Sequence, residues 1–108
     1  MIQEFDRYEY GRRLFEQRKY AQAARELEEV LASGEGLGTG DARELLMRAL
    51  FHSAQLTKAE AAARAALEDN PTDAYALVVL GRTLYRQARY EEAETYLKQA
   101  EAFGVSTV

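Results

Sequence analysis

The chain has 108 residues, of which 47% are hydrophobic and 30% charged, and its formal net charge is −4. This composition is too apolar for a disordered chain and too charged for a membrane-embedded one, and the negative charge argues against general binding of nucleic acid. Cysteine is absent, which excludes disulfides and thiolate metal sites. The longest apolar run, residues 74–80, is too short to cross a bilayer. The N-terminus does not resemble a secretion signal, so we expect a soluble, cytoplasmic protein without a membrane partner.

Residues that favour helices dominate the chain, with 19 Ala, 14 Glu, 13 Leu and 11 Arg. Apolar residues recur at helical spacing, and the pattern breaks near residues 18–19, 54–55 and 88–89. The spacing predicts helices over residues 3–17, 20–32, 41–53, 56–69, 73–86 and 90–103. These segments pair into hairpins, with one break inside each pair.

Candidate caps mark the starts of two predicted helices. Thr39 or Asp41 is expected to cap the third helix, and Thr72 or Asp73 the fifth. The segment 33–40 between the second and third helices is rich in glycine and is predicted to be a flexible connection.

The first and last hairpins repeat each other at a constant offset of 70 residues. A weaker copy lies between them, 36 residues after the first and 34 residues before the third. The aligned residues are Gly11, Leu14, Tyr20, Ala23 and Leu27 in the first copy, Leu46, Leu50, Ala59, Ala66 and Pro71 in the second, and Leu77, Leu80, Gly81, Leu84, Tyr90, Ala93, Leu97 and Ala100 in the third.

This pattern resembles the tetratricopeptide repeat (TPR), a 34-residue helical hairpin with glycine, tyrosine and alanine at fixed offsets. The resemblance implies an all-α fold: a right-handed α-solenoid of three hairpins and six helices, without a long C-terminal capping helix. It also implies a single domain over residues 1–108, with repeats at about 4–37, 40–73 and 74–107. In each outer repeat the glycine is expected to face an alanine of the second helix, Gly11 with Ala23 and Gly81 with Ala93.

The chemistry-bearing residues argue against catalysis. His52 is the single histidine, so the sequence predicts no metal site and no cofactor. Carboxylate pairs such as Glu28 and Glu29 lie on the second helices, where we expect them to be solvated. The glycine-rich segment lacks the Lys-Ser/Thr ending of a phosphate-binding loop and does not follow a predicted strand. We therefore expect a protein that is not an enzyme.

The resemblance implies that the first helices of the hairpins line a concave groove that binds a peptide. The position after the glycine, or after Met47, is an arginine in every copy, and the position three residues on is aromatic. These residues are Arg12, Arg48 and Arg82, followed by Phe15, Phe51 and Tyr85. Further residues expected on this surface are Tyr8, His52, Tyr75 and Arg86.

An arginine beside an aromatic ring suits a peptide that carries carboxylates and apolar side chains. The alternative is a structural stripe, in which the rings fill the groove and the arginines pair with their neighbours. Arg12 has acidic residues within one turn on both sides, and Arg48 follows an acidic residue by four positions, whereas Arg82 has no acidic helical neighbour. We therefore expect ligand contact first at Arg82, Tyr85 and Arg86.

A second hypothesis concerns the sixth helix, where Tyr96, Leu97 and Phe103 include residues that would meet a following helix. Either the charged residues Glu94, Lys98 and Glu101 solvate this end, or the end pairs with a second copy to form a homodimer. The function predicted first is thus a scaffold that binds a protein or peptide, and the alternative is a structural subunit that acts through self-association.

Overall fold

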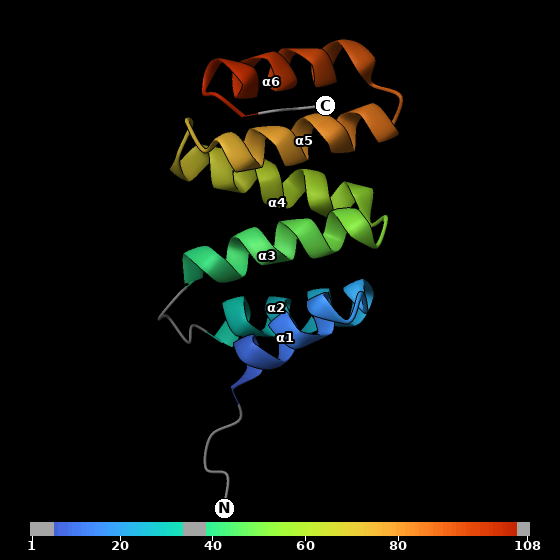
Figure 1. Ribbon diagram of the computed structural model, residues 1–108, viewed down its shortest axis with the longest axis vertical. Coiled ribbons are helices and arrows are strands. Elements are labelled where there is room, and N and C mark those ends of the chain that lie inside the picture. Colours follow the sequence, from blue (N-terminus) through green and yellow to red (C-terminus); the bar gives the residue numbers. More distant parts are fainter. Residues whose placement is uncertain (1–5, 34–38, 106–108) are drawn as a thin grey trace, which may run out of the picture. The chain divides into compact units, whose positions relative to one another are not determined.

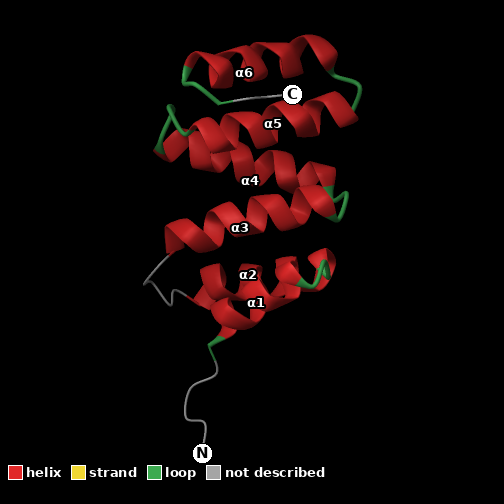
Figure 2. Cartoon of the chain, in the orientation of Figure 1, coloured by secondary structure: helices red, strands yellow, loops and turns green. Residues whose placement is uncertain are grey.

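The computed structural model describes residues 6–33 and 39–105. Over these residues the chain forms six α-helices and no strand (Figures 1 and 2). The helices are α1 (Arg7–Glu16), α2 (Tyr20–Ser33), α3 (Thr39–His52), α4 (Leu56–Asp69), α5 (Ala74–Arg86) and α6 (Tyr90–Ala102). The predicted all-α class, built from three helical hairpins, is confirmed.

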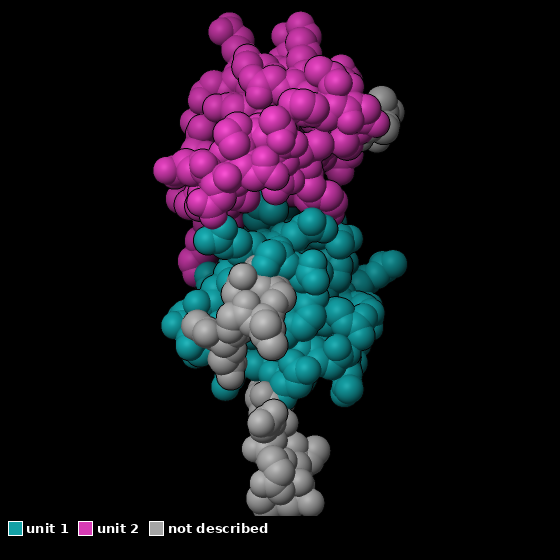
Figure 3. Space-filling model, turned by 90° about the vertical axis from the view of Figure 1, so that its left-hand side faces the viewer, with its two compact units in different colours: residues 1–53 teal, residues 54–108 magenta. Residues whose placement is uncertain are grey.

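The six helices belong to two compact units (Figure 3). Unit 1 spans residues 1–53 and unit 2 spans residues 54–108. In unit 1, α2 packs against both α1 and α3, and in unit 2, α5 packs against both α4 and α6 (Figure 1). The boundary falls inside the second predicted repeat. The single domain and the right-handed superhelix therefore stay predictions, and each unit is considered by itself below.

The first helix begins later than the sequence predicts. Asp6 is its N-cap, with a side-chain oxygen that accepts a hydrogen bond of 3.0 Å from the backbone N–H of Glu9. The helix therefore starts at Arg7, so the predicted start at residue 3 is wrong. The predicted helical residues 3–5 lie outside the part of the chain that is described.

The other predicted caps have mixed outcomes. Asp73 caps α5 by accepting a hydrogen bond of 3.1 Å from the backbone N–H of Ala76, while the Thr72 hydroxyl bonds to Asn70. Helix α3 already begins at Thr39, so Asp41 lies within its first turn instead of capping it. Residues 34–38 of the glycine-rich connection lie outside the described residues.

Each hairpin turns at a residue with left-handed backbone geometry. These residues are Arg18, Ala54 and Ala88, with φ of 64°, 60° and 63°. The backbone N–H that follows reaches back five residues, from Lys19 to the Leu14 carbonyl and from Arg89 to the Leu84 carbonyl, at 2.9 Å in both cases. Such bonds close the end of a helix and normally favour glycine at the left-handed position. The three turns lie where the sequence predicts breaks.

Both repeat glycines lie against a leucine of the next helix. A Cβ at Gly81 would stand 2.5 Å from Leu97 Cδ2 and 3.3 Å from the Ala93 carbonyl oxygen. At Gly11 the nearest atom would be Leu27 Cγ at 3.1 Å, so the close neighbour there is Leu27 and not the predicted Ala23. The two glycines thus allow close approach of paired helices, and more tightly in unit 2.

Candidate functional site

The first candidate surface is one face of α5. The opposite face is buried and contains Ala76, Leu77, Val79, Leu80, Gly81, Thr83 and Leu84. On the outer face Tyr75 is 39% exposed and Tyr85 is 59% exposed, and the exposed Arg82 and Arg86 share that face. We call these four residues the α5 stripe. It contains all the groove residues that the sequence predicts for this helix.

Arg82 is the arginine of the stripe best placed to accept a new partner. Within residues 6–33 and 39–105, its side chain has no hydrogen bond or ion pair. One turn earlier on the helix stands Val78, so no carboxylate of α5 competes for the guanidinium. Arg86 follows one turn later and adds positive charge to the same end of the stripe.

The corresponding part of α1 is internally neutralised. Arg12 donates hydrogen bonds to both Glu9 and Glu16, the latter at 2.7 Å. Hydrogen bonding to Glu9 and the charges of both carboxylates raise the pKa of Arg12 above its ordinary value. Partial burial, followed by the negative charge of Asp41, raises the pKa of the Tyr8 hydroxyl. Carboxylates therefore surround this predicted end of the groove and leave little net positive charge.

In unit 1 three predicted groove residues and Tyr20 form an aromatic cluster. The rings of Phe15 and Tyr20 meet edge to face with centroids 5.1 Å apart. His52 of α3 stacks on Tyr20 at 4.8 Å and meets the edge of Phe15 at 5.9 Å and Phe51 at 5.6 Å. The Arg48 guanidinium lies over the Phe15 ring, 4.9 Å from its centroid. These residues hold α3 against the first hairpin.

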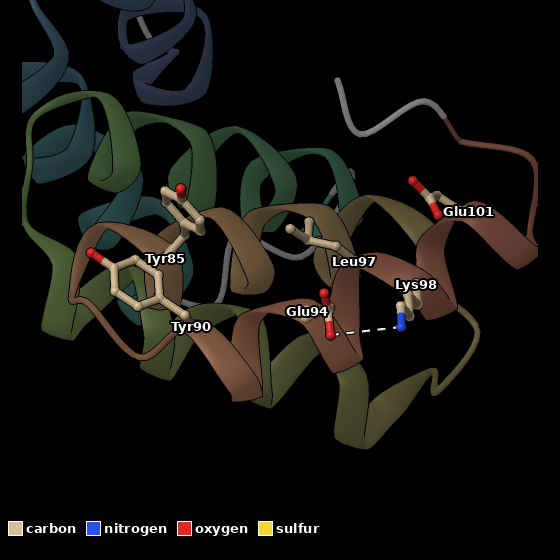
Figure 4. Close-up of a pocket in the computed structure, with 6 residues that line it drawn as sticks. All are labelled: Tyr85, Tyr90, Glu94, Leu97, Lys98 and Glu101. Atoms are coloured by element: carbon tan, nitrogen blue, oxygen red, sulfur yellow. Dashed lines mark ion pairs between the residues drawn. The ribbon is translucent and has the colours of Figure 1, made fainter.

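In unit 2 the equivalent aromatic pair is open to solvent. The rings of Tyr85 and Tyr90 meet edge to face at 4.9 Å, and they are 59% and 56% exposed. They border a hollow of about 490 Å³ on the face shared by α5 and α6 (Figure 4). We call it the α6 hollow, and its lining residues are Tyr85, Tyr90, Glu94, Leu97, Lys98 and Glu101.

Sequence analysis missed this hollow, because it assigned Tyr90 to packing and Glu94, Lys98 and Glu101 to the solvated surface. Lys98 and Glu94 form an ion pair of 3.6 Å, drawn as a dashed line in Figure 4. The signal that could have revealed the hollow is the matched five-residue spacing of Phe15 to Tyr20 and of Tyr85 to Tyr90.

The three residues predicted for self-association do not form one surface. Tyr96 is half-buried, and its hydroxyl accepts a hydrogen bond of 3.2 Å from Arg64 of α4, whose guanidinium also lies over the tyrosine ring. Leu97, the next residue, lines the α6 hollow on another side of the helix. Phe103 follows the end of α6 and is 51% exposed.

A charged network joins α4 to α6 in unit 2. Glu60 bonds to Arg64 at 3.0 Å and to Arg89 at 2.9 Å, and Arg89 also binds Glu92. Partial burial alone would raise the pKa of Glu60, but the hydrogen bonds from both arginines outweigh it and hold that pKa below its ordinary value. The network has the geometry of a structural clamp, because each charged group already faces an opposite charge.

No cluster of three or more potential metal-binding side chains occurs in the described part of the chain. Among the same residues, no helix is both long enough and apolar enough to span a membrane.

Two family models match the sequence, and both are described as tetratricopeptide repeat. One matches residues 8–74 and the other residues 50–104, so together they cover all six helices except the first residue of α1. A search of the curated proteins gives no match. Repeats of this kind generally mediate protein–protein interaction and are typically non-catalytic.

Proposed function

Since the chain belongs to the tetratricopeptide repeat family, we propose that it is a non-catalytic interaction module that binds a peptide segment of a protein partner along the α5 stripe. The peptide carries acidic and apolar side chains. The observation that supports this most strongly is Arg82, an exposed guanidinium without an ion pair among the described residues, flanked by two exposed tyrosines.

The chemistry of the stripe favours that class of peptide. A guanidinium presents a planar fork of donors that matches a carboxylate, and it stays charged at every physiological pH. Tyr75 and Tyr85 offer rigid contact area to apolar side chains at a small cost in conformational entropy. The combination selects a carboxylate flanked by apolar groups, since a basic peptide would meet Arg82 and Arg86 with like charge.

The arginines of unit 1 support this assignment to α5 by contrast. Arg12 is held by two carboxylates and Arg48 lies over Phe15, so a ligand would first have to displace those contacts. Arg82 requires no such displacement, and the ligand specificity should therefore depend mainly on α5.

The test begins with a pull-down on the full chain and mass spectrometry, from which the shortest bound peptide is synthesised. Arg82→Glu should weaken that peptide by about tenfold or more, because one charge-assisted contact becomes a repulsion. Arg25→Glu changes the same charge at an exposed site on α2 and is the matched control. Exchanging an acidic peptide residue for lysine should restore binding to Arg82→Glu. Equal affinity for both variants would contradict the proposal.

Self-association is the alternative function, and exposed Phe103 is the residue that favours it. Tyr96 contributes less than the sequence predicts, because Arg64 already holds it. Light scattering over a dilution series tests this alternative. A concentration-dependent dimer that disappears in Phe103→Ala would support it, and a monomer at every concentration would eliminate it.

A further inference from the structure

The chain builds the same two-ring platform twice, once in each unit. Phe15 and Tyr20 cross the turn between α1 and α2, and Tyr85 and Tyr90 cross the turn between α5 and α6. Their sequence offset is 70 residues. The two pairs agree closely in geometry, with centroids 5.1 and 4.9 Å apart and interplanar angles of 72° and 68°.

In unit 1 a helix covers the platform. Helix α3 packs on α2 and places His52 on Tyr20 and Arg48 over Phe15. Arg48 and His52 are four residues apart, so both side chains emerge from one face of α3. Under this cover the two rings of the platform are half-buried.

In unit 2 the platform lacks such a cover among the described residues. Both tyrosine rings are more than half exposed, and the α6 hollow extends from them along α6 past Leu97 (Figure 4). Leu97 corresponds in register to Leu27, which is fully buried in unit 1. The hollow therefore occupies the same position on its hairpin that α3 fills on the first hairpin.

The floor of the hollow is more polar than its counterpart on α2. Leu97 is kept, but the flanking pairs 70 residues apart are Ala24 and Glu94, Glu28 and Lys98, and Leu31 and Glu101. Two carboxylates and one ammonium group thus line the hollow, and the platform presents two electron-rich ring faces. Ring faces and carboxylates both attract cations.

We propose that the α6 hollow docks an amphipathic helix of a protein partner, and that this helix presents an arginine or lysine four residues before a histidine or another aromatic residue. Its apolar side packs on Leu97, its ring stacks on Tyr90, and its cation lies over Tyr85. This surface is distinct from the function proposed above, because it depends on Tyr90 and Leu97 and does not use Arg82.

The probe is a synthetic peptide with the sequence of residues 40–53, which carries Arg48 and His52 and is held helical by a lactam bridge between positions 40 and 44. It is labelled with fluorescein and titrated with the full chain. We expect saturable binding, and we expect NMR shift changes at Tyr85, Tyr90 and Leu97.

Two variants of the protein and one of the peptide test the contacts. Tyr90→Ala should weaken binding about tenfold, through loss of ring stacking and the apolar contact around it. Glu94→Lys keeps the fold, because Glu94 is exposed, and should weaken binding about threefold by repelling the cation of the probe. A peptide with alanine at both Arg48 and His52 should bind about tenfold more weakly.

Tyr10→Ala, which removes a tyrosine that is 42% exposed on α1, is the matched control and should leave binding unchanged. Arg82→Glu should also leave it unchanged, which separates this site from the α5 stripe. Three results would overturn the proposal. They are no saturation up to about 1 mM protein, the weakest affinity that a specific site would show; shifts confined to Phe15 and Tyr20, where the probe would have displaced α3; and a homodimer that Tyr90→Ala dissociates, which would assign the hollow to a second copy.

Discussion

In unit 1 the rings of Phe15 and Tyr20 lie beneath α3, while in unit 2 the rings of Tyr85 and Tyr90 face solvent. The hairpins beneath these rings are built alike, with a glycine against a leucine and a left-handed turn at the same register position. The flanking residues differ in the way that exposure requires, since a phenylalanine under α3 has a tyrosine as its exposed counterpart. A repeat position is therefore core or surface according to what packs on it, and four predictions test how far this contrast extends.

The largest effect is expected from the repeat glycines. Gly81→Ala forces a methyl group to within 2.5 Å of Leu97, whereas Gly11→Ala meets Leu27 at 3.1 Å. After the gain in helix propensity, Gly81→Ala should lower the free energy of unfolding by about 2 kcal/mol and Gly11→Ala by less than about 1 kcal/mol. Urea denaturation followed by circular dichroism measures both. Equal losses would show that the two hairpins pack equally tightly.

The aromatic platforms should differ next. A double-mutant cycle of Tyr20→Ala and His52→Ala should give a coupling of about 1 kcal/mol, because the stacked rings are half-buried by α3. Tyr90→Ala should lower the free energy of unfolding by less, about 0.5 kcal/mol, because its ring is 56% exposed. The same denaturation assay applies. A larger loss at Tyr90 than at Tyr20 would contradict the distinction between covered and uncovered rings.

The charged network makes part of the stability of unit 2 dependent on pH. Because the pKa of Glu60 is lowered in the folded protein, its stabilisation is present above the unfolded value near 4.5 and is lost as pH falls through the lower folded value. Glu60→Gln should therefore cost about 1 kcal/mol at pH 7 and much less at pH 3. Urea midpoints at the two pH values measure the difference, and Glu91→Gln, at an exposed site on the same unit, serves as the control. A pH-independent cost would eliminate the electrostatic explanation.

The smallest effect is expected at the turns, which the two units share. Arg18→Gly and Ala88→Gly should each raise the free energy of unfolding by about 0.5 kcal/mol, because glycine adopts positive φ without the Cβ penalty. Gly104→Ala, at a φ of 87° after α6, should have the opposite sign. Thermal melts compare the three variants. A loss at Ala88→Gly together with a gain at Arg18→Gly would show that the turns are not equivalent.

Much of the fold follows from the sequence because packing residues such as Leu80, Leu84 and Ala93 keep one spacing in the repeats. The left-handed turns could be located but not recognised, since arginine and alanine are poor indicators of that geometry. The groove was harder to predict. Register places Arg48 and Phe15 at related positions of two helices, but only tertiary packing brings the guanidinium over the ring. The α6 hollow escaped prediction because its charged lining is also typical of ordinary surface.

The clamp around Glu60 has a consequence for the motion of the last helix. Arg89, Glu92 and Tyr96 tie the first two turns of α6 to α4, whereas the later turns are held mainly by packing on α5. Fraying of α6 should therefore begin at its C-terminal end and stop near Tyr96, with backbone amides after Leu97 exchanging their hydrogens faster than those before it. The floor of the α6 hollow would then be assembled at one end and adjustable at the other.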